Sequence, residues 1–484
     1  MNKTIILKVL AKMLAVEAGL LIIPAIVSTV HGEVYTALCF LLTALAVTLL
    51  CLPAFFMKKN SDSSIYAKEG LVIVGIAWMM WSLVGAVPLT LSGDIPNYVD
   101  ALFETVSGFT TTGATVLTDI ESLSKGGLFW RSFTHWIGGM GVLVLVMAII
   151  PVSDNSSMHL IRAEVPGPTV GKLVPKGKTT AKILYLIYLA MTVLEVIFLL
   201  CGGMSLYDSL VHAFGTAGTG GFSVKNAGIA YYDSSYINWV ITVFMVLFGI
   251  NFNLYFFLII GKFRDVLKNG ELKVYLGIII AASAAITIKI MPLFDTVGKA
   301  VEHAVFQVAS IITTTGYATV DFNNWDSFSK TVLLFLMVTG ACAGSTGGGI
   351  KISRIIIMIK TCSRSIKKLI HPKSVNVIRT NEKIVDMNTM HGVSVYVVMY
   401  MLIIMASLLL VSLDNFDTET NFTAVLSCVN NVGPGLGMVG PMGNYSEFSA
   451  MTKLVFCFDM LLGRLEIFPL FMVFSPLLWR RKFV

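Results

Sequence analysis

Charged residues are scarce in this sequence. Only 13% of its 484 residues are Asp, Glu, Lys or Arg, about half of the roughly 25% typical of soluble domains, whereas 56% are hydrophobic. With a mean hydropathy of +0.80, such a chain lacks the polar groups to cover a water-facing surface. The composition excludes an ordinary cytosolic enzyme, a disordered protein and a nucleic-acid-binding protein, and it predicts an all-α integral membrane protein.

Paired cysteines and clustered histidines are also lacking. The seven cysteines are scattered, and none stands in a Cys-x-x-Cys motif. We therefore expect neither a disulfide framework nor a zinc site. The seven histidines lie far apart, and no His-Glu-x-x-His motif occurs. Because a membrane-embedded enzyme would need such a cluster, we expect no enzymatic activity.

Long hydrophobic runs fill most of the chain. A bilayer core of about 30 Å requires about 20 apolar residues in a helix. Ten runs meet this requirement, over residues 5–30, 35–57, 69–92, 127–151, 181–203, 235–261, 273–293, 329–360, 391–413 and 450–478. Ten is an even number, so both termini are expected on the same side of the membrane.

Lysine and arginine are distributed unevenly between alternate connecting segments. If the N-terminus is cytoplasmic, the segment 351–383 alone holds nine basic residues on the inner side. The outer loops then hold only Lys125, Lys225, Lys330 and Lys453. Because basic residues favour the cytoplasmic side, we expect both termini there. The net charge of +7 is explained by contact with anionic lipid, and nucleic acid is not an expected partner.

A Gly- and Thr-rich turn recurs four times after the first two runs. Each turn follows a half-apolar helix too short to cross a bilayer, and each precedes a long run. The turns cover residues 107–115, 215–223, 310–318 and 429–437. Aligned by eye, the glycines that coincide are Gly113, Gly221, Gly316 and Gly435. The pattern predicts four pseudo-repeats of span, re-entrant helix, loop and span around one pore.

The repeats divide the chain into five segments. Two additional transmembrane helices occupy residues 1–60. The four predicted pore repeats follow over residues 61–165, 166–265, 266–384 and 385–484.

The four turns have the chemistry of a cation filter. Backbone that stops inside a membrane must line a cavity or be buried in protein. Rings of carbonyl oxygens can replace the water shell of a weakly hydrated cation such as K⁺. Glycine supplies the dihedral angles that such a turn needs, and threonine hydroxyls add ligands or brace the turn. A surface loop is the alternative for any one turn taken alone.

The predicted ion-binding residues follow from this alignment. They are Thr110, Thr111, Thr112, Gly113, Gly218, Thr219, Gly220, Gly221, Thr313, Thr314, Thr315, Gly316, Val432, Gly433, Pro434 and Gly435.

The eighth run is interrupted by five glycines in the ten residues 340–349. Each glycine costs a helix about 1 kcal/mol relative to alanine, so the helix is expected to break here. A broken helix at membrane depth is tolerated beside a cavity, and we interpret the break as a gate. Close packing between helices is the alternative. The predicted gate residues are Gly344, Ser345, Thr346, Gly347, Gly348, Gly349 and Lys351.

Arg464 lies near the middle of the last hydrophobic run. A charge at that depth is costly and is functional by default. One interpretation places Arg464 below the filter as an electrostatic barrier to cations. The other is a buried structural pair with Asp459, Glu466 or another acid.

Taken together, these features resemble the TrkH potassium-uptake proteins of the Trk/Ktr/HKT superfamily over nearly the whole chain. The two additional N-terminal spans favour the TrkH type over the eight-span KtrB type. In the plant relatives a serine at the first filter glycine accompanies sodium passage, so Gly113 implies selectivity for K⁺. The resemblance is carried by residues 111–113, 219–221, 314–316, 431–435, 343–351 and 464.

The resemblance also implies partners and a location. It implies a homodimer with one pore in each protomer, in the cytoplasmic (inner) membrane of a bacterium and in contact with membrane lipid. A cytoplasmic ring of nucleotide-binding regulatory subunits of the TrkA type would control the gate, and residues 351–383 are the expected docking surface. K⁺ would be the transported ion. Ion-coupled symport with H⁺ or Na⁺ is the alternative mechanism.

Overall fold

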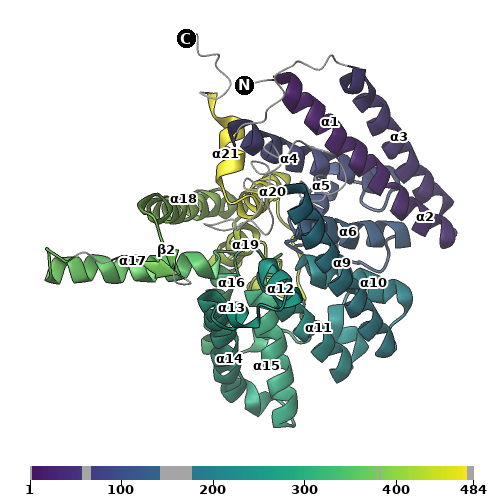
Figure 1. Cartoon of the computed structure of the whole chain (residues 1–484). Helices are drawn as coiled ribbons and strands as arrows, with labels where there is room; N and C mark the ends of the chain where they lie inside the picture. Colours follow the sequence, from purple (N-terminus) through teal and green to yellow (C-terminus); the bar gives the residue numbers. More distant parts are fainter. Residues whose placement is uncertain (1–2, 57–66, 142–176, 375–376, 381–382, 477–484) are drawn as a thin grey trace, which may run out of the picture.

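The computed structural model of the chain is almost entirely helical (Figure 1). It describes residues 3–56, 67–141, 177–374, 377–380 and 383–476. Within these ranges the only strands are β1 (Arg379–Thr380) and β2 (Lys383–Ile384), which pair antiparallel. The all-helical class predicted from the composition is confirmed. The predicted boundaries at 60 and 165, and the chain ends, lie outside the described residues.

Long apolar helices make up the outer part of the fold. Six helical stretches of the described residues are long and apolar enough to cross a bilayer, and a pair bent by 92° would be a seventh. One stretch combines α1 (Lys3–Leu20) with the short α2 (Ile22–Val30), and the others are formed by α3 (Val34–Phe56), α4 (Ala67–Leu91), α9 (Gly177–Cys201), α14 (Gly270–Ile290) and α18 (Met387–Val411). The count of ten spans stays a prediction, partly because the run 127–151 continues beyond the described residues.

Four short helices lie between the long ones. They are α5 (Tyr98–Phe109), α10 (Leu206–Gly218), α15 (Val297–Ile312) and α19 (Thr418–Asn430). Each begins after a side-chain oxygen that accepts a backbone N–H of the first turn, from Asn97, Ser205, Thr296 and Asp417. Such caps stabilise a helix by about 1 kcal/mol. At about 1.5 Å per residue, none of the four helices reaches across a bilayer core.

A second helix follows each short one and ends early. These helices are α6 (Lys125–Gly139), α11 (Ser235–Phe248), α16 (Ser327–Thr339) and α20 (Ala450–Arg464). After α11 the chain turns into α12 (Phe252–Ile259), and after α20 it turns into α21 (Phe468–Phe474). The sequence predicts spans over 235–261 and 450–478, and in the structure each of these runs is broken into two helices. Gly249 ends α11, and the left-handed residues Glu466 and Ile467 separate α20 from α21.

We call each short helix with the loop and second helix that follow it a unit. Unit 1 contains α5 and α6, unit 2 contains α10 and α11, unit 3 contains α15 and α16, and unit 4 contains α19 and α20. The remaining short elements lie within the units or between other helices. Those within the units are η1 (Gly228–Tyr232), η3 (Phe322–Asn324) and η5 (Gly437–Val439), and those between other helices are α13 (Phe263–Leu267), η2 (Met291–Leu293) and η4 (Ser412–Asp414).

Of the N-terminal helices, α2 and α3 pack against α6 of unit 1, whereas α1 packs against α3 and α4 (Figure 1). The carboxylate of Glu33 caps α6 by accepting the N–H groups of Lys125 (2.7 Å) and Gly126 (3.1 Å). The Ser28 side chain lies close against Gly126, where a side-chain carbon would not fit. The connection from α2 to α3 therefore fixes the start of α6.

Helix α17 (Ile352–Ile370) projects from the body beside α18 (Figure 1). Its base is held by Arg354, which donates to Glu466 (2.9 Å) and lies 4.1 Å from the ring centre of Tyr396. The ion pair joins α17 to the break between α20 and α21. The two halves of the interrupted eighth run, α16 and α17, are thus separate helices joined by residues 340–351.

Candidate functional site

The four units share one backbone conformation where the short helix ends. We call residues 110–113, 218–221, 313–316 and 430–433 loops 1 to 4. The second residue of every loop is left-handed, with φ between 55° and 59° at Thr111, Thr219, Thr314 and Asn431. The fourth residue is a glycine with φ between 77° and 99°, at Gly113, Gly221, Gly316 and Gly433. In every loop the N–H of the third residue donates to the carbonyl five positions earlier.

Loop 4 requires a correction to the sequence alignment. The by-eye alignment pairs Gly435 with the other three glycines, but the left-handed glycine in the equivalent position is Gly433. Gly435 instead donates its N–H to the carbonyl of Val439 (2.6 Å) and packs against Thr423. Pro434 and Gly435 therefore follow loop 4, and Asn430 and Asn431 belong to it. The motif Val-Gly-Pro-Gly offers two glycines, and spacing alone selects the wrong one.

The four glycines close a ring in chain order. A side-chain carbon on Gly113 would collide with the carbonyl oxygen of Gly220, one on Gly221 with that of Thr315, and one on Gly316 with that of Val432. On Gly433 it would lie 2.6 Å from the carbonyl oxygen of Thr112, so loop 4 returns to loop 1. Each glycine is needed because the neighbouring backbone occupies the place of its side chain.

The carbonyl oxygens of this ring have no hydrogen-bond donors. Thr112, Gly220, Thr315 and Val432 are all buried, and no described residue donates to their carbonyls. More than nine in ten buried backbone carbonyls in proteins are paired. A cation that has lost its water shell can bind to these four buried, unpaired carbonyl oxygens.

Threonine hydroxyls brace loops 1 and 3. The Thr110 and Thr112 hydroxyls lie 2.8 Å apart, and the Thr313 and Thr315 hydroxyls also lie 2.8 Å apart. The sequence leaves open whether threonines brace the loops or bind an ion. These four brace them. In loop 4 the Asn431 amide takes a similar part, since it donates to the Thr112 hydroxyl (3.0 Å).

A belt of polar contacts joins each short helix to the second helix of the preceding unit. Because the order runs from unit 1 through unit 4 and back to unit 1, the belt follows the glycine ring. The contacts are Tyr207 to the Lys125 carbonyl (2.7 Å), Asn238 to Glu302 (2.6 Å), Lys330 to Glu419 (3.9 Å) and Lys453 to Asp100 (2.7 Å).

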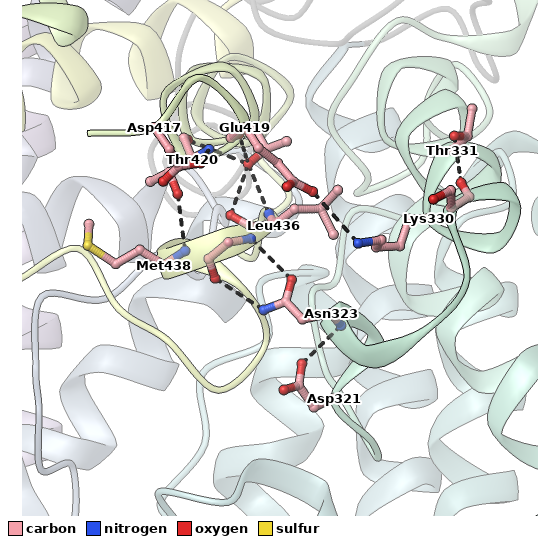
Figure 2. A network of polar contacts seen from close by, with 12 residues as sticks. Asp321, Asn323, Lys330, Thr331, Asp417, Glu419, Thr420, Leu436 and Met438 are labelled. Carbon is pink, nitrogen blue, oxygen red and sulfur yellow. Dashed lines mark hydrogen bonds and ion pairs between the residues drawn. The ribbon is translucent and has the colours of Figure 1, made fainter. Parts of the chain in front are cut away.

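Figure 2 shows the contact between units 3 and 4. The Lys330–Glu419 ion pair there is the longer of the two ion pairs in the belt. The Asn323 amide in η3 accepts the N–H of Gly437 (3.1 Å) and donates to the carbonyl of the same residue (3.1 Å). Thr420 of α19 accepts the N–H of Met438 (3.2 Å). The backbone that follows loop 4 is therefore held from two sides, by unit 3 and by its own short helix.

A cavity of about 180 Å³ lies above the ring and is lined by all four loops. Arg131 lines it, but its charge is paired with the buried carboxylate of Glu104 (2.9 Å). Lys225 lines it as well and donates to Glu121 (3.0 Å), which lowers the pKa of that exposed carboxyl. Both basic residues at this mouth are therefore neutralised by an acid, which lowers their repulsion of a cation.

The Gly-rich loop, residues 340–351, lies against the opposite side of loops 3 and 4. The N–H of Gly348 donates to the Thr314 hydroxyl (2.6 Å). A side-chain carbon on Gly348 would lie 2.5 Å from the Asn430 carbonyl, and one on Gly347 would lie 2.9 Å from the Thr313 carbonyl. The sequence predicts a gate here, and the structure brings its residues directly beneath two of the four loops.

Two charged residues hold the Gly-rich loop. The ammonium of Lys351 donates to the carbonyls of Gly347 and, at 3.1 Å, Gly348. The carboxylate of Glu271 at the start of α14 accepts the N–H groups of Ala343 (2.8 Å) and Ser353 (3.1 Å). Sequence reasoning missed Glu271, because it stands 72 residues before Ala343 in an ordinary helix start with no motif around it.

Arg464 joins the Gly-rich loop to unit 1. Its guanidinium donates to the carbonyls of Thr346 (2.7 Å), Gly139 (2.7 Å) and Gly138. The two acids that the sequence offers as partners have other contacts, since Glu466 binds Arg354 and Asp459 accepts the Ser407 hydroxyl (2.7 Å). Arg464 thus places a positive charge where the ends of α6 and α20 meet the loop.

Comparisons with known proteins identify the family of this chain. The sequence profile of the TrkH family, described as a cation transport protein, matches residues 40–280 and 288–483. The potassium uptake proteins TrkH of Escherichia coli K12 and Salmonella typhimurium are 34% and 33% identical to this chain, over 98% of it and 99% of each relative.

The same relationship holds in three dimensions. The crystal structure of the potassium transporter TrkH from Vibrio parahaemolyticus matches 99% of this chain and 100% of its own, with a TM-score of 0.89 and 30% sequence identity. The family resemblance expected from the loop motifs, the Gly-rich break and the arginine is therefore confirmed. On the profile match and on identity above 30% along nearly its whole length, the chain belongs to the TrkH family of cation transport proteins.

Proposed function

We propose that the chain takes up K⁺ across the cytoplasmic membrane of a bacterium, along the axis of the four loops. The observation that carries this proposal is the ring of buried carbonyls without donors, at Thr112, Gly220, Thr315 and Val432. Potassium is named because the similar proteins are potassium uptake proteins and because carbonyl rings suit a weakly hydrated ion. The membrane potential supplies about 2.3 kcal/mol per charge and 100 mV.

The filter in this proposal consists of loops 1 to 4 with the fourth corrected. Its residues are Thr110, Thr111, Thr112, Gly113, Gly218, Thr219, Gly220, Gly221, Thr313, Thr314, Thr315, Gly316, Asn430, Asn431, Val432 and Gly433. The units would be four pseudo-repeats around one pore, with ten spans in total and both termini in the cytoplasm.

The Gly-rich loop would be the gate and Arg464 the barrier below the filter. The contacts of Gly348 with Thr314 and Asn430 support a loop that obstructs the path beneath loops 3 and 4. Arg464 holds that loop to α6 because it donates to the carbonyls of both Thr346 and Gly139. A homodimer and a TrkA-type regulatory subunit acting on this gate belong to the same proposal; the relatives are named as components of a Trk system, which supports a partner.

Ion-coupled symport with H⁺ or Na⁺ is the second candidate. The observation that favours it is Glu17 in α1, which is fully buried and whose carboxylate has no hydrogen-bond partner among the described residues. Such a group inside a membrane is functional by default. Potassium flux into liposomes that is independent of H⁺ and Na⁺ gradients would exclude this mechanism.

The experiment that tests the filter is Gly113→Ser in purified protein reconstituted into liposomes. We expect the K⁺ over Na⁺ permeability ratio to fall, because a side chain at Gly113 presses on the Gly220 carbonyl and reshapes the ring. Rubidium flux with unlabelled K⁺, Na⁺ and Li⁺ as competitors measures the ratio. An unchanged ratio in a correctly folded variant would show that this ring does not select the ion.

A further inference from the structure

The carbonyl of Gly433 differs from those of the other three loop glycines. It accepts a hydrogen bond from the hydroxyl of Tyr445 (2.9 Å). No described residue donates to the carbonyls of Gly113, Gly221 or Gly316. Gly433 is also buried, whereas its three counterparts are partly exposed. Of the four glycine carbonyls at the outer edge of the ring, three therefore lack a donor among the described residues, and that of Gly433 is hydrogen-bonded to Tyr445.

Tyr445 is held firmly where unit 4 meets unit 1. It lies between η5 and α20, is 2% exposed, and donates its backbone N–H to the Thr115 carbonyl (2.8 Å). Its ring centre lies 5.5 Å from those of Phe103 on α5 and Phe456 on α20. With the ring packed and the backbone bonded, the hydroxyl has a fixed place beside loop 4.

The same junction is where the glycine ring is loosest. A side-chain carbon on Gly433 would lie 2.6 Å from the Thr112 carbonyl, and the equivalent approach is closer at each of the other three glycines. The φ of Gly433 is 99°, compared with 77° to 82° for the others. Loop 4 is thus displaced from fourfold regularity at the residue that Tyr445 holds.

We propose that Tyr445 is a positioning residue that weakens the outermost ion site of the filter by sharing the Gly433 carbonyl. The hydroxyl hydrogen, which carries partial positive charge, competes with a cation for that oxygen. A weak outer site favours conduction, because an ion must leave each site as readily as it binds. This inference rests on the proposed function, and it adds a residue outside the loops that sets ion affinity.

The test is Tyr445→Phe, which keeps the packed ring and removes the hydroxyl. A hydrogen bond of this kind contributes about 0.5–1.5 kcal/mol. The Rb⁺ concentration that half-saturates Rb⁺ uptake should therefore fall about two- to tenfold. The matched control is Tyr98→Phe. The Tyr98 hydroxyl also bonds a backbone carbonyl at 2.9 Å, that of Leu83, away from the loops, and its loss should leave half-saturation unchanged.

Calorimetric titration of the purified protein with K⁺ separates the possible results. Tighter K⁺ binding in Tyr445→Phe than in the unaltered protein supports the inference. Equal or weaker binding overturns it, since the hydroxyl would then only brace the loop. If the unaltered protein itself binds no K⁺, the proposed filter fails, and that failure is distinct from the failure of this inference. Thermal unfolding of both variants shows whether they remain folded.

Discussion

The two halves of each unit differ in regularity. At the loops, all four units share the same left-handed residue, the same glycine position and the same backbone hydrogen bond. At the far ends of their second helices they differ. Helix α11 bends sharply into α12, α16 opens into the Gly-rich loop, and α20 stops at Arg464. The difference indicates that closing a ring requires four loops of equivalent backbone conformation. The far ends of the second helices do not take part in the ring and can differ from unit to unit.

The regular half should tolerate the least change. Gly221→Ala places a carbon against the Thr315 carbonyl at a residue with φ of 77°. The left-handed backbone costs about 1–2 kcal/mol and overpacking about 1–3 kcal/mol, so potassium flux should fall at least about tenfold. Gly277→Ala in α14, where a side-chain carbon meets nothing within 4 Å, is the control and should keep its flux. Equal flux in both variants would contradict the ring.

The specialised half should respond in the opposite direction. Arg464→Gln removes a charge and its bonds to the Thr346 and Gly139 carbonyls, so we expect potassium flux to rise about tenfold. Arg464→Lys keeps the charge without the forked geometry. If the barrier is electrostatic, only Gln raises the flux; if Arg464 mainly anchors the Gly-rich loop, both substitutions do. A fall in flux with Gln, in folded protein, would argue against both roles.

The smallest effects concern the polar belt, and they affect stability. Lys453→Met leaves the partly buried carboxylate of Asp100 unpaired and should lower unfolding stability by about 1–3 kcal/mol. Lys330→Met removes a 3.9 Å pair whose acid is half exposed, so it should cost at most about 1 kcal/mol. Thermal unfolding of the two variants in the same detergent compares them directly. A larger loss for Lys330→Met would reverse the order of the two contacts.

Much of the molecule could be predicted from the sequence, because the signals are local. Hydrophobic length marks the long helices, and a Gly/Thr turn after a short helix marks each of the first three loops. The by-eye alignment of the fourth loop is wrong because Asn430 replaces threonine or glycine and Asn431 replaces threonine, so composition no longer marks the register. The dihedral angle of Gly433 identifies that register, and no sequence pattern reports a dihedral angle.

The contacts that hold the site were beyond prediction for a different reason. Glu271 reaches Ala343, Asn323 reaches Gly437, and Arg464 reaches Gly139, all across long stretches of chain. Glu271 and Asn323 are not unusual in their local sequence, and the position of Arg464 in an apolar run does not identify the carbonyls that it binds. The break between α11 and α12 is not predicted because the apolar composition continues through the turn, so hydrophobicity alone does not distinguish a bent helix pair from a straight span.

One chain supplies all four sides of the glycine ring, and this has an evolutionary consequence. In an assembly of four identical subunits, every substitution appears four times at once, and a change that helps on one side is imposed on the others. Here each side can be altered alone. The asparagine of loop 4 and the tyrosine behind it are single-copy departures of this kind, so the proposed filter can change one loop at a time.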